Sequence, residues 1–376
     1  MDTTAADAGS TDKTPSTTIA EYTPDTGVKE HSQIDKDILR MGKLLSVEDY
    51  VHAHDVYANG KNSVKSSGNR KLKSLSAGAS SMGFKEALTF AAYYGGDAEY
   101  ANNFIEPIIL GTGDFGAASA IARQEMATKG TQYVTMYMYV LRELYDAVDD
   151  CKAQDQADNT DDVHAWDEGW AFYAGSLEGT DGTGKGEILH ALAEKRASNY
   201  NPANDVNADL LAMFKEGKDL LNDAHGDMTK CDSVAALIPN MVAKMNAPLL
   251  QGAMRYAHKM TAAVGGGDKE AAEGWAFATA ILPLIDECNS GAAATIKKNQ
   301  EFGIASPMAD DEETVFMAYQ SVFECLGVTC DDIGELAGAP ECSLFSDTLD
   351  AGGDAAGVKA GVIGIVAAVV AGFAMF

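Results

Sequence analysis

Residues 131–148 read TQYVTMYMYVLRELYDAV, and this stretch indicates the class of fold. Apolar side chains recur in it at three- and four-residue spacing, at Val134, Met138, Leu141, Tyr145 and Val148. This spacing lays one apolar stripe along an α-helix. The segment is apolar around most of its circumference until Arg142, which predicts a central helix. Prolines number only 9 in 376 residues and alternating β-branched runs are absent, so we expect an all-α fold.

A six-residue motif occurs twice in the chain. Asp167-Glu-Gly-Trp-Ala-Phe172 returns as Ala272-Glu-Gly-Trp-Ala-Phe277, with five of six residues identical. Such a repeat indicates two related helical bundles in tandem. We expect the first bundle over residues 31–200 and the second over 201–345, divided where Asn-Tyr-Asn-Pro-Ala-Asn-Asp breaks the helical pattern.

The two ends of the chain differ in character. Residues 1–30 are polar and small, which predicts a disordered arm, and they contain no secretory signal, so we expect the true start upstream or a leader already removed. Residues 346–376 join a small-residue spacer to 17 uncharged residues at the end. This tail resembles a glycolipid (GPI) anchor signal or a short membrane-spanning helix, which places the protein at a cell surface or periplasmic membrane. A tail-anchored protein facing the cytosol is the alternative.

Charge and cysteine content limit the classes of function. Lys and Arg total 28 against 56 Asp and Glu, a net charge of −28. Nucleic acid is excluded as a partner because like charges would meet, and cations are the natural ligands. Six cysteines without a C-x-x-C pair favour disulfides in an oxidising compartment, and their connectivity stays open.

The segment Val163-His-Ala-Trp-Asp-Glu-Gly-Trp-Ala-Phe-Tyr-Ala-Gly-Ser-Leu177 contains the strongest candidate site. His164 and Glu168 are one helical turn apart, so an imidazole and a carboxylate can converge on one cation, with Asp167 beside them. We expect the opposite face to be core, formed by Trp166, Trp170, Tyr173 and Leu177. The alternative is a surface His–Glu pair in a helix whose first-turn acids complement its dipole.

Further metal ligands are predicted on other helices. Glu143 and Asp146 lie off the apolar stripe of residues 131–148 and could face His164, as carboxylates do in di-iron bundles. Weaker candidates are the repeat counterparts His258 and Glu273, and a local group of Asp49 and His52. No nucleotide-binding loop, nucleophile elbow or zinc-protease motif occurs, so no catalytic residue is assigned.

Four segments carry a resemblance to a known family. They are the His-Ala-Trp-Asp-Glu-Gly-Trp-Ala-Phe-Tyr-Ala-Gly-Ser-Leu-Glu run at 164–178, Gly-Thr-Gln-Tyr-Val at 130–134, Gly-Lys-Asn-Ser at 60–63 and Cys-Leu-Gly-Val-Thr-Cys-Asp-Asp-Ile-Gly at 325–334. The chain resembles the Fe-assimilating, low-iron-inducible (also high-CO2-inducible) periplasmic proteins of algae over roughly residues 35–340. It is more distantly similar to imelysin-like helical proteins, which carry a His-x-x-Glu motif.

The resemblance implies a secreted or surface-bound protein that binds iron and assists its uptake. By motif match the ligands are His164, Asp167 and Glu168, with Glu143 as an addition. Its partners would be Fe2+ or Fe3+ ions, with or without a synergistic anion, and an iron transporter or reductase. Two alternatives stay open: a metal-dependent oxidase or hydrolase that uses the same ligands, and a structural or adhesive surface protein without a metal site.

Overall fold

The computed structural model describes residues 17–153, 160–303 and 308–342, and these residues form helices and one short hairpin. The all-α prediction is confirmed. The elements up to the candidate helix are α1 (Lys29–Ser32), α2 (Ile34–Ser46), α3 (Tyr50–Asn59), β1 (Val64–Lys65), β2 (Gly68–Asn69), α4 (Leu72–Ser80), α5 (Lys85–Tyr93), α6 (Tyr100–Leu110), η1 (Gly113–Phe115), α7 (Ala120–Lys129), η2 (Gly130–Thr135), α8 (Met136–Ala153) and α9 (Asp161–Ala174). The remaining elements are η3 (Ser176–Glu178), α10 (Leu189–Tyr200), α11 (Val206–Asn222), α12 (Met228–Lys259), α13 (Asp268–Cys288), α14 (Ser290–Gln300), α15 (Glu312–Gln320) and α16 (Cys330–Ile333).

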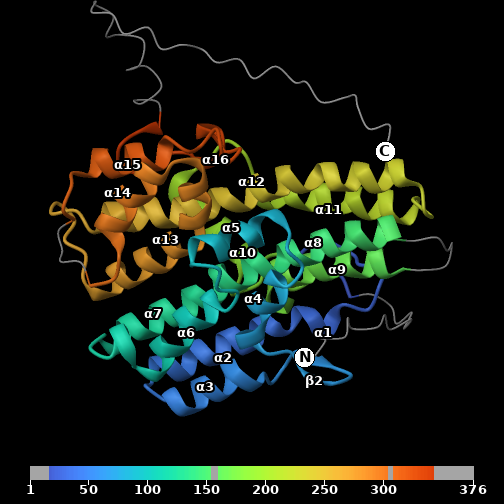
Figure 1. The fold of residues 1–376 in the computed structure, drawn as a ribbon, viewed down its shortest axis with the longest axis horizontal. Helices are drawn as coiled ribbons and strands as arrows, with labels where there is room; N and C mark the ends of the chain where they lie inside the picture. Colours follow the sequence, from blue (N-terminus) through green and yellow to red (C-terminus); the bar gives the residue numbers. More distant parts are fainter. Residues whose placement is uncertain (1–16, 154–159, 304–307, 343–376) are drawn as a thin grey trace, which may run out of the picture.

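Figure 1 shows the long helices α8, α9, α11 and α12 lying side by side, and α8 packs closely against α9. Helices α2, α3, α6 and α7 lie on one side of this group, and α14, α15 and α16 lie on the other. One continuous apolar core runs through both sides. The break predicted at residues 199–205 falls between α10 and α11, and the division into two bundles stays a prediction.

Helix α8 is central, as its sequence predicts. Its side chains Tyr137, Leu141 and Leu144 are fully buried. The π-helical turn η2 connects α7 directly to α8. Gly130 at this junction lies against the ring of Phe104, where a larger side chain would crowd it.

Helix α9 carries the candidate motif and is buried on almost every side. The indole N–H of Trp166 donates to the carbonyl of Phe214, and that of Trp170 donates to the carbonyl of Ile19, each at 2.8 Å. The helix ends at Ala174, so Leu177 lies beyond it in η3 and is only half-buried. The prediction that Leu177 continues the apolar stripe is therefore wrong, because Gly175 turns the chain at a φ of +80°.

Residues 17–28, which we call the strap, pack against α9 although they fall within the predicted disordered arm. Ile19, Tyr22 and Val28 of the strap are buried. The rings of Tyr22, Trp170 and Phe214 form a cluster, in which the Tyr22 centroid lies 5.4 Å from that of Trp170 and 6.1 Å from that of Phe214, and the latter two lie 5.0 Å apart. The few apolar residues of this polar segment therefore pack into the core.

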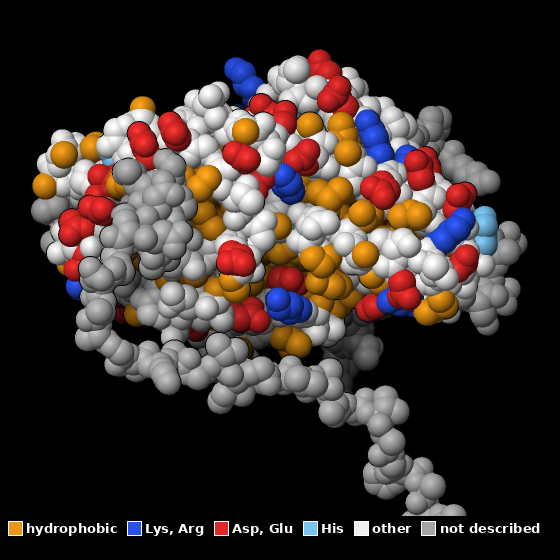
Figure 2. Space-filling model, turned by 90° about the horizontal axis from the view of Figure 1, so that it is seen from above, with side chains coloured by type: hydrophobic (Ala, Val, Ile, Leu, Met, Phe, Trp, Pro, Cys, Tyr) orange, Lys and Arg blue, Asp and Glu red, His pale blue; other side chains and the backbone are white. Residues whose placement is uncertain are grey.

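Three disulfides confirm the prediction from the cysteine count. They join Cys151 to Cys231, Cys288 to Cys325 and Cys330 to Cys342. The first ties α8 to α12. Figure 2 shows carboxylates over much of one face of the molecule, with fewer Lys and Arg among them.

The predicted spacer and anchor tail, residues 346–376, lie outside the described residues, as does most of the predicted arm. Among the helices that the structure describes, none combines the length and the apolar character that a membrane crossing requires.

Candidate metal centre

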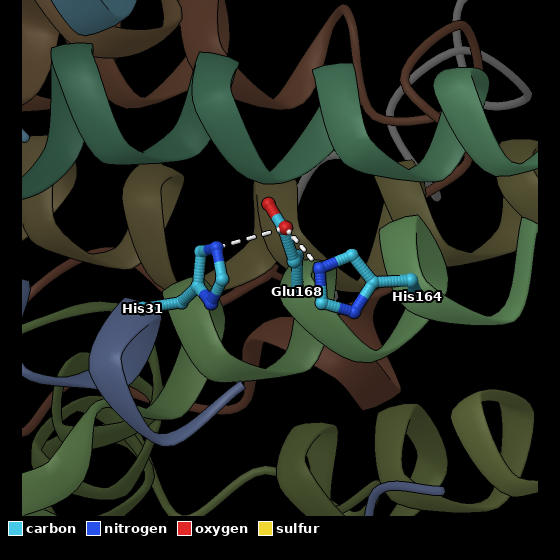
Figure 3. Close-up of side chains that lie close together, drawn as sticks. All are labelled: His31, His164 and Glu168. Atoms are coloured by element: carbon cyan, nitrogen blue, oxygen red, sulfur yellow. Dashed lines mark ion pairs between the residues drawn. The ribbon is translucent and has the colours of Figure 1, made fainter. Parts of the chain in front are cut away.

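Three side chains from two elements meet beside α9. His31 comes from α1, and His164 and Glu168 come from α9 (Figure 3). Glu168 Oε1 lies 2.8 Å from His31 Nε2 and 3.0 Å from His164 Nε2. One candidate ligand atom from each residue lies within 4.8 Å of the others. Two imidazole nitrogens and one carboxylate oxygen therefore face a common point.

The local folding of the chain accounts for this convergence. His164 and Glu168 are one turn apart on α9, so their side chains share a face. The short helix α1 packs against α9, and the His31 ring contacts the ring of Phe172 edge-on with centroids 5.7 Å apart. Phe172 belongs to the repeated motif, and it holds His31 against the carboxylate.

The centre is shielded from solvent but not sealed. The exposed fractions of the His31, Glu168 and His164 side chains are 7%, 11% and 14%. His164 Nδ1 lies 3.0 Å from the hydroxyl of Thr26 in the strap. His31 Nδ1 is buried and finds no hydrogen-bond partner within the described residues. The strap thus covers one imidazole and orients its ring.

Charges within the cluster shift the three pKa values in different directions. Burial alone raises the pKa of Glu168, but attraction to His31 and hydrogen bonds from both imidazoles outweigh it and hold that pKa well below the ordinary value. Burial lowers the pKa of His31 despite the nearby Glu168. Burial also acts to lower the pKa of His164, but the hydrogen bond to Glu168 and the charge of Glu168 outweigh it, so this pKa is raised. Glu168 is therefore a carboxylate that stabilises positive charge beside it.

A guanidinium completes the surroundings of the cluster. Arg70, which follows the β1–β2 hairpin, contacts His31 Nε2 and donates from Nη1 to the carbonyl of Val64 at 2.9 Å. Arg70 is buried, and its charge acts to lower the pKa of both His31 and His164. The guanidinium of Arg70 thus contacts the same imidazole nitrogen of His31 that faces Glu168.

The sequence itself relates the chain to known proteins. The family described as low iron-inducible periplasmic protein matches residues 3–362, nearly the whole chain. The chain belongs to this family. No curated protein and no solved structure matches it. The description of the low iron-inducible periplasmic family confirms the predicted connection to iron assimilation and the periplasmic location.

In this member of the low iron-inducible periplasmic family, Asp167 does not face the cluster. Its Oδ1 accepts a hydrogen bond from the Tyr22 hydroxyl at 2.6 Å. Its Oδ2 accepts from the N–H groups of Asp25 and Thr26, both at 2.9 Å, and from the Thr26 hydroxyl at 2.8 Å. Burial raises its pKa to about 6 although these hydrogen bonds oppose the shift. Consecutive side chains on a helix point about 100° apart, so Asp167 faces away from the cluster that contains Glu168. Its hydrogen bonds fasten the strap to α9 instead.

Glu143 and Asp146 lie near the cluster but are engaged elsewhere. Arg142 Nη1 is 2.6 Å from Glu143 Oε1, and Arg142 Nη2 is 3.3 Å from Asp146 Oδ2. Glu143 is buried, and burial together with repulsion from Glu168 raises its pKa well above the ordinary value. It sits behind the centre as a neighbouring acid and is not among the three convergent ligands.

The weaker candidates lie apart from the centre. His258 Nδ1 is 2.6 Å from Glu312 Oε1. Glu273 is buried, and its charge and hydrogen bond add to the burial that raises the pKa of Tyr256. Asp49 and His52 form an exposed pair at 2.8 Å in the first turn of α3. The structure places none of these four residues with His164.

Sequence reasoning missed two residues of the centre, His31 and Arg70. His31 stands at the predicted border between arm and bundle, and Arg70 follows a short polar hairpin. Neither has a helical spacing to His164 that could be recognised. The only available signal for His31 was its residue type, since the chain has 7 histidines.

Proposed function

We propose that this protein binds an iron ion through His31, His164 and Glu168 and assists iron assimilation at the cell surface or in the periplasm. The observation that supports this most is the convergence of two imidazole nitrogens on one buried carboxylate oxygen. Imidazole and carboxylate are suitable ligands for both Fe2+ and Fe3+. Family membership supports the iron assignment independently of this geometry.

An ion at this point would replace the direct contacts of both imidazoles with Glu168 Oε1, and the Arg70 guanidinium would have to withdraw from His31 Nε2. The nitrogen–oxygen distances of 2.8 and 3.0 Å are hydrogen-bond lengths, so the three side chains would separate slightly around the ion. Three protein ligands leave coordination positions open. Arg70 could hold an anion such as carbonate at one of them, which would offset the repulsion between its guanidinium and the ion.

The rest of the molecule favours this role. A net charge of −28 raises the local concentration of cations around the protein. We also propose that residues 346–376 attach the protein to a membrane near the iron transporter or reductase that receives the ion. We propose binding without turnover, and an assay of Fe2+ oxidation by the purified protein would contradict this if each molecule oxidised many ions.

Calorimetric titration with anaerobic Fe2+ and with Fe3+ as its nitrilotriacetate complex tests the site. We expect one high-affinity ion in the wild type and its loss in His31→Ala and in Glu168→Gln, because each change removes a ligand. His52→Ala is the matched control, since His52 also pairs with a carboxylate but lies on the surface. Unchanged stoichiometry and affinity in Glu168→Gln would overturn the proposed site.

A further inference from the structure

A cavity of about 850 Å³ lies among the loop that follows η3, the helices α10 and α11, and the strap. The loop, residues 179–186, reads Gly-Thr-Asp-Gly-Thr-Gly-Lys-Gly, and we call it the glycine loop. None of the residues that line the cavity belongs to the metal centre. The volume lies within the range of small-molecule sites.

The glycine loop is held in place by contacts within the chain. The N–H of Gly184 donates to the carbonyl of Glu178 at 2.9 Å, and the N–H of Ala20 in the strap donates to the carbonyl of Gly179 at 2.9 Å. A Cβ at Gly186 would overlap the carboxylate of Glu178, so only glycine lets the loop approach this side chain so closely. The wall of the cavity is therefore formed without a ligand.

Two buried ionisable side chains, His190 of α10 and Glu178 of η3, line the cavity. Their exposed fractions are 6% and 2%, and His190 Nδ1 lies 3.3 Å from Glu178 Oε1 without forming a hydrogen bond. The other polar atoms, His190 Nε2 and Glu178 Oε2, retain accessible surface and have no partner among the described residues. Nε2 lies beside Gly182 of the cavity wall, where a Cβ would be 3.6 Å from it. Each buried side chain thus presents one free polar atom to the cavity.

These free atoms indicate a missing hydrogen-bond donor. An ionised carboxylate can only accept hydrogen bonds, and leaving one buried without them costs free energy. Within the described part of the chain, no Lys or Arg pairs with Glu178, and the contact with His190 supplies no hydrogen bond. A primary ammonium group has three N–H donors, so one such group on a ligand satisfies the carboxylate and contacts the imidazole.

Charges of both signs surround this buried pair. Lys185 of the glycine loop, Lys195 of α10 and Lys215 of α11 line the cavity and are exposed. Among the residues that the structure describes, none of these lysines forms an ion pair with the acids of the cavity, which include Glu21 and Glu194. A purely anionic ligand would meet the carboxylates, and a purely cationic one would meet the lysines. A ligand that carries an ammonium group at one end and a carboxylate at the other satisfies both.

We propose that this cavity binds a short peptide of two or three residues with free termini. The N-terminal ammonium contacts Glu178 and His190, and the lysines receive the C-terminal carboxylate. Ala208 and Ala212 of α11 are small, so they leave room for the side chains of the peptide. A single amino acid fills only a small part of the cavity and is expected to bind more weakly. This proposal does not depend on iron binding.

Titration calorimetry with tri-L-alanine and three related compounds tests the proposal. N-acetyl-tri-L-alanine lacks the ammonium group, tri-L-alanine amide lacks the carboxylate, and L-alanine is shorter. We expect acetylation to raise the Kd about tenfold or more, because it removes charge-assisted hydrogen bonds. The amide and L-alanine should also bind more weakly than tri-L-alanine. Equal affinities of the free and acetylated peptides, or no binding of tri-L-alanine at millimolar concentration, would overturn the proposal.

Variants locate the site. Ala212 is exposed and lines the cavity, so Ala212→Trp should fill the cavity and abolish binding of tri-L-alanine. Ala294→Trp, at an exposed position of α14 outside the cavity, is the matched control and should bind as the wild type does. Glu178→Gln should weaken binding of the free peptide but not that of the acetylated one, which has no ammonium group to lose. Unchanged affinity for tri-L-alanine in both Ala212→Trp and Glu178→Gln would contradict the assignment.

Maltotriose distinguishes a charged from a neutral occupant. Carboxylates and ammonium groups also bind hydroxyl groups, so a neutral polyhydroxylated compound competes with the peptide as an explanation. We expect maltotriose not to bind, because it neutralises none of the charges in the cavity. Binding of maltotriose that Ala212→Trp abolishes, together with failure of tri-L-alanine, would overturn the assignment to a compound with both charges.

Discussion

At the scale of single residues, Asp167 and Glu168 are neighbours whose carboxyl groups have opposite environments. Two imidazoles hold the pKa of Glu168 well below its ordinary value, whereas burial raises that of Asp167 to about 6. Glu168 can therefore serve a cation, and Asp167 serves the hydrogen bonds of the strap. The difference follows from which side of α9 each side chain occupies.

The raised pKa of Asp167 predicts a dependence of stability on pH. The folded state holds this proton up to about pH 6, while the unfolded chain releases it near pH 4. The contribution of Asp167 to stability is thus greatest below pH 4, declines as pH rises toward 6 and is constant above. Between pH 4.5 and 6.5 the free energy of unfolding should fall by about 2 kcal/mol more in the wild type than in Asp167→Asn. Chemical denaturation at both pH values measures this, and identical declines would contradict it.

The sequence could predict part of the centre at this scale. His164 and Glu168 lie on one helix, so their spacing alone places them together. Arg70 depends on the position of a hairpin, and His31 on the packing of a four-residue helix, and neither is encoded in a local pattern. Asp167 has the right residue type, but only the packed strap shows that its oxygens are already occupied.

At the scale of elements, the end of α9 depends on close packing against α2. Asp35 of α2 accepts hydrogen bonds from the Ser176 hydroxyl at 2.9 Å and from the N–H of Leu177 at 2.6 Å. Gly175 makes room for this carboxylate, because a Cβ at this position would lie 2.5 Å from Asp35 Oδ2. This contact fixes where α9, which carries two of the proposed ligands, ends.

Gly175→Ala should therefore destabilise the protein strongly. The new methyl group meets Asp35, and the φ of +80° disfavours any side chain. We expect a loss of about 3 kcal/mol in the free energy of unfolding. Gly179→Ala is the matched control, with a φ of +73° but no atom nearer than 3.8 Å, and should cost about 1 kcal/mol. Equal losses in thermal or chemical denaturation would show that the contact with Asp35 has no effect.

Helices whose apolar side chains recur at regular helical spacing could be predicted from the sequence, whereas segments composed mostly of polar residues could not. Helix α8 follows directly from its stripe of apolar side chains. The strap has few apolar residues, and its order depends on a pocket that Trp170 and Phe214 form only after folding. The end of α9 was also not predicted, because the sequence does not show that Asp35 packs against Gly175.

At the scale of the whole molecule, the disulfides tie distant helices together. Cys151 and Cys231 close a loop of 80 residues, whereas Cys330 and Cys342 close one of only 12. The sequence indicated disulfides from the even cysteine count but not their pairing, because pairing depends on which helix ends meet. The longer loop restricts the unfolded chain more.

Removal of the two disulfides should reflect this difference. We expect the double change Cys151→Ala with Cys231→Ala to cost about 4.5 kcal/mol of stability, and Cys330→Ala with Cys342→Ala to cost about 3 kcal/mol. Denaturant unfolding of both variants, with the third disulfide intact, provides the comparison. A reversed order would mean that strain or residual structure, and not loop length, determines the stabilisation.

The strap has a kinetic consequence for the metal centre. Thr26 contacts both His164 and Asp167, so detachment of this segment would free the His164 imidazole to turn away from an ion bound at the proposed site. The rate of release then follows the frequency of local opening, and not the strength of coordination alone. Tyr22→Phe, which removes one anchor, would leave equilibrium affinity nearly unchanged while it shortens the residence time of the ion. Amide hydrogen exchange in residues 17–28 would report the same opening.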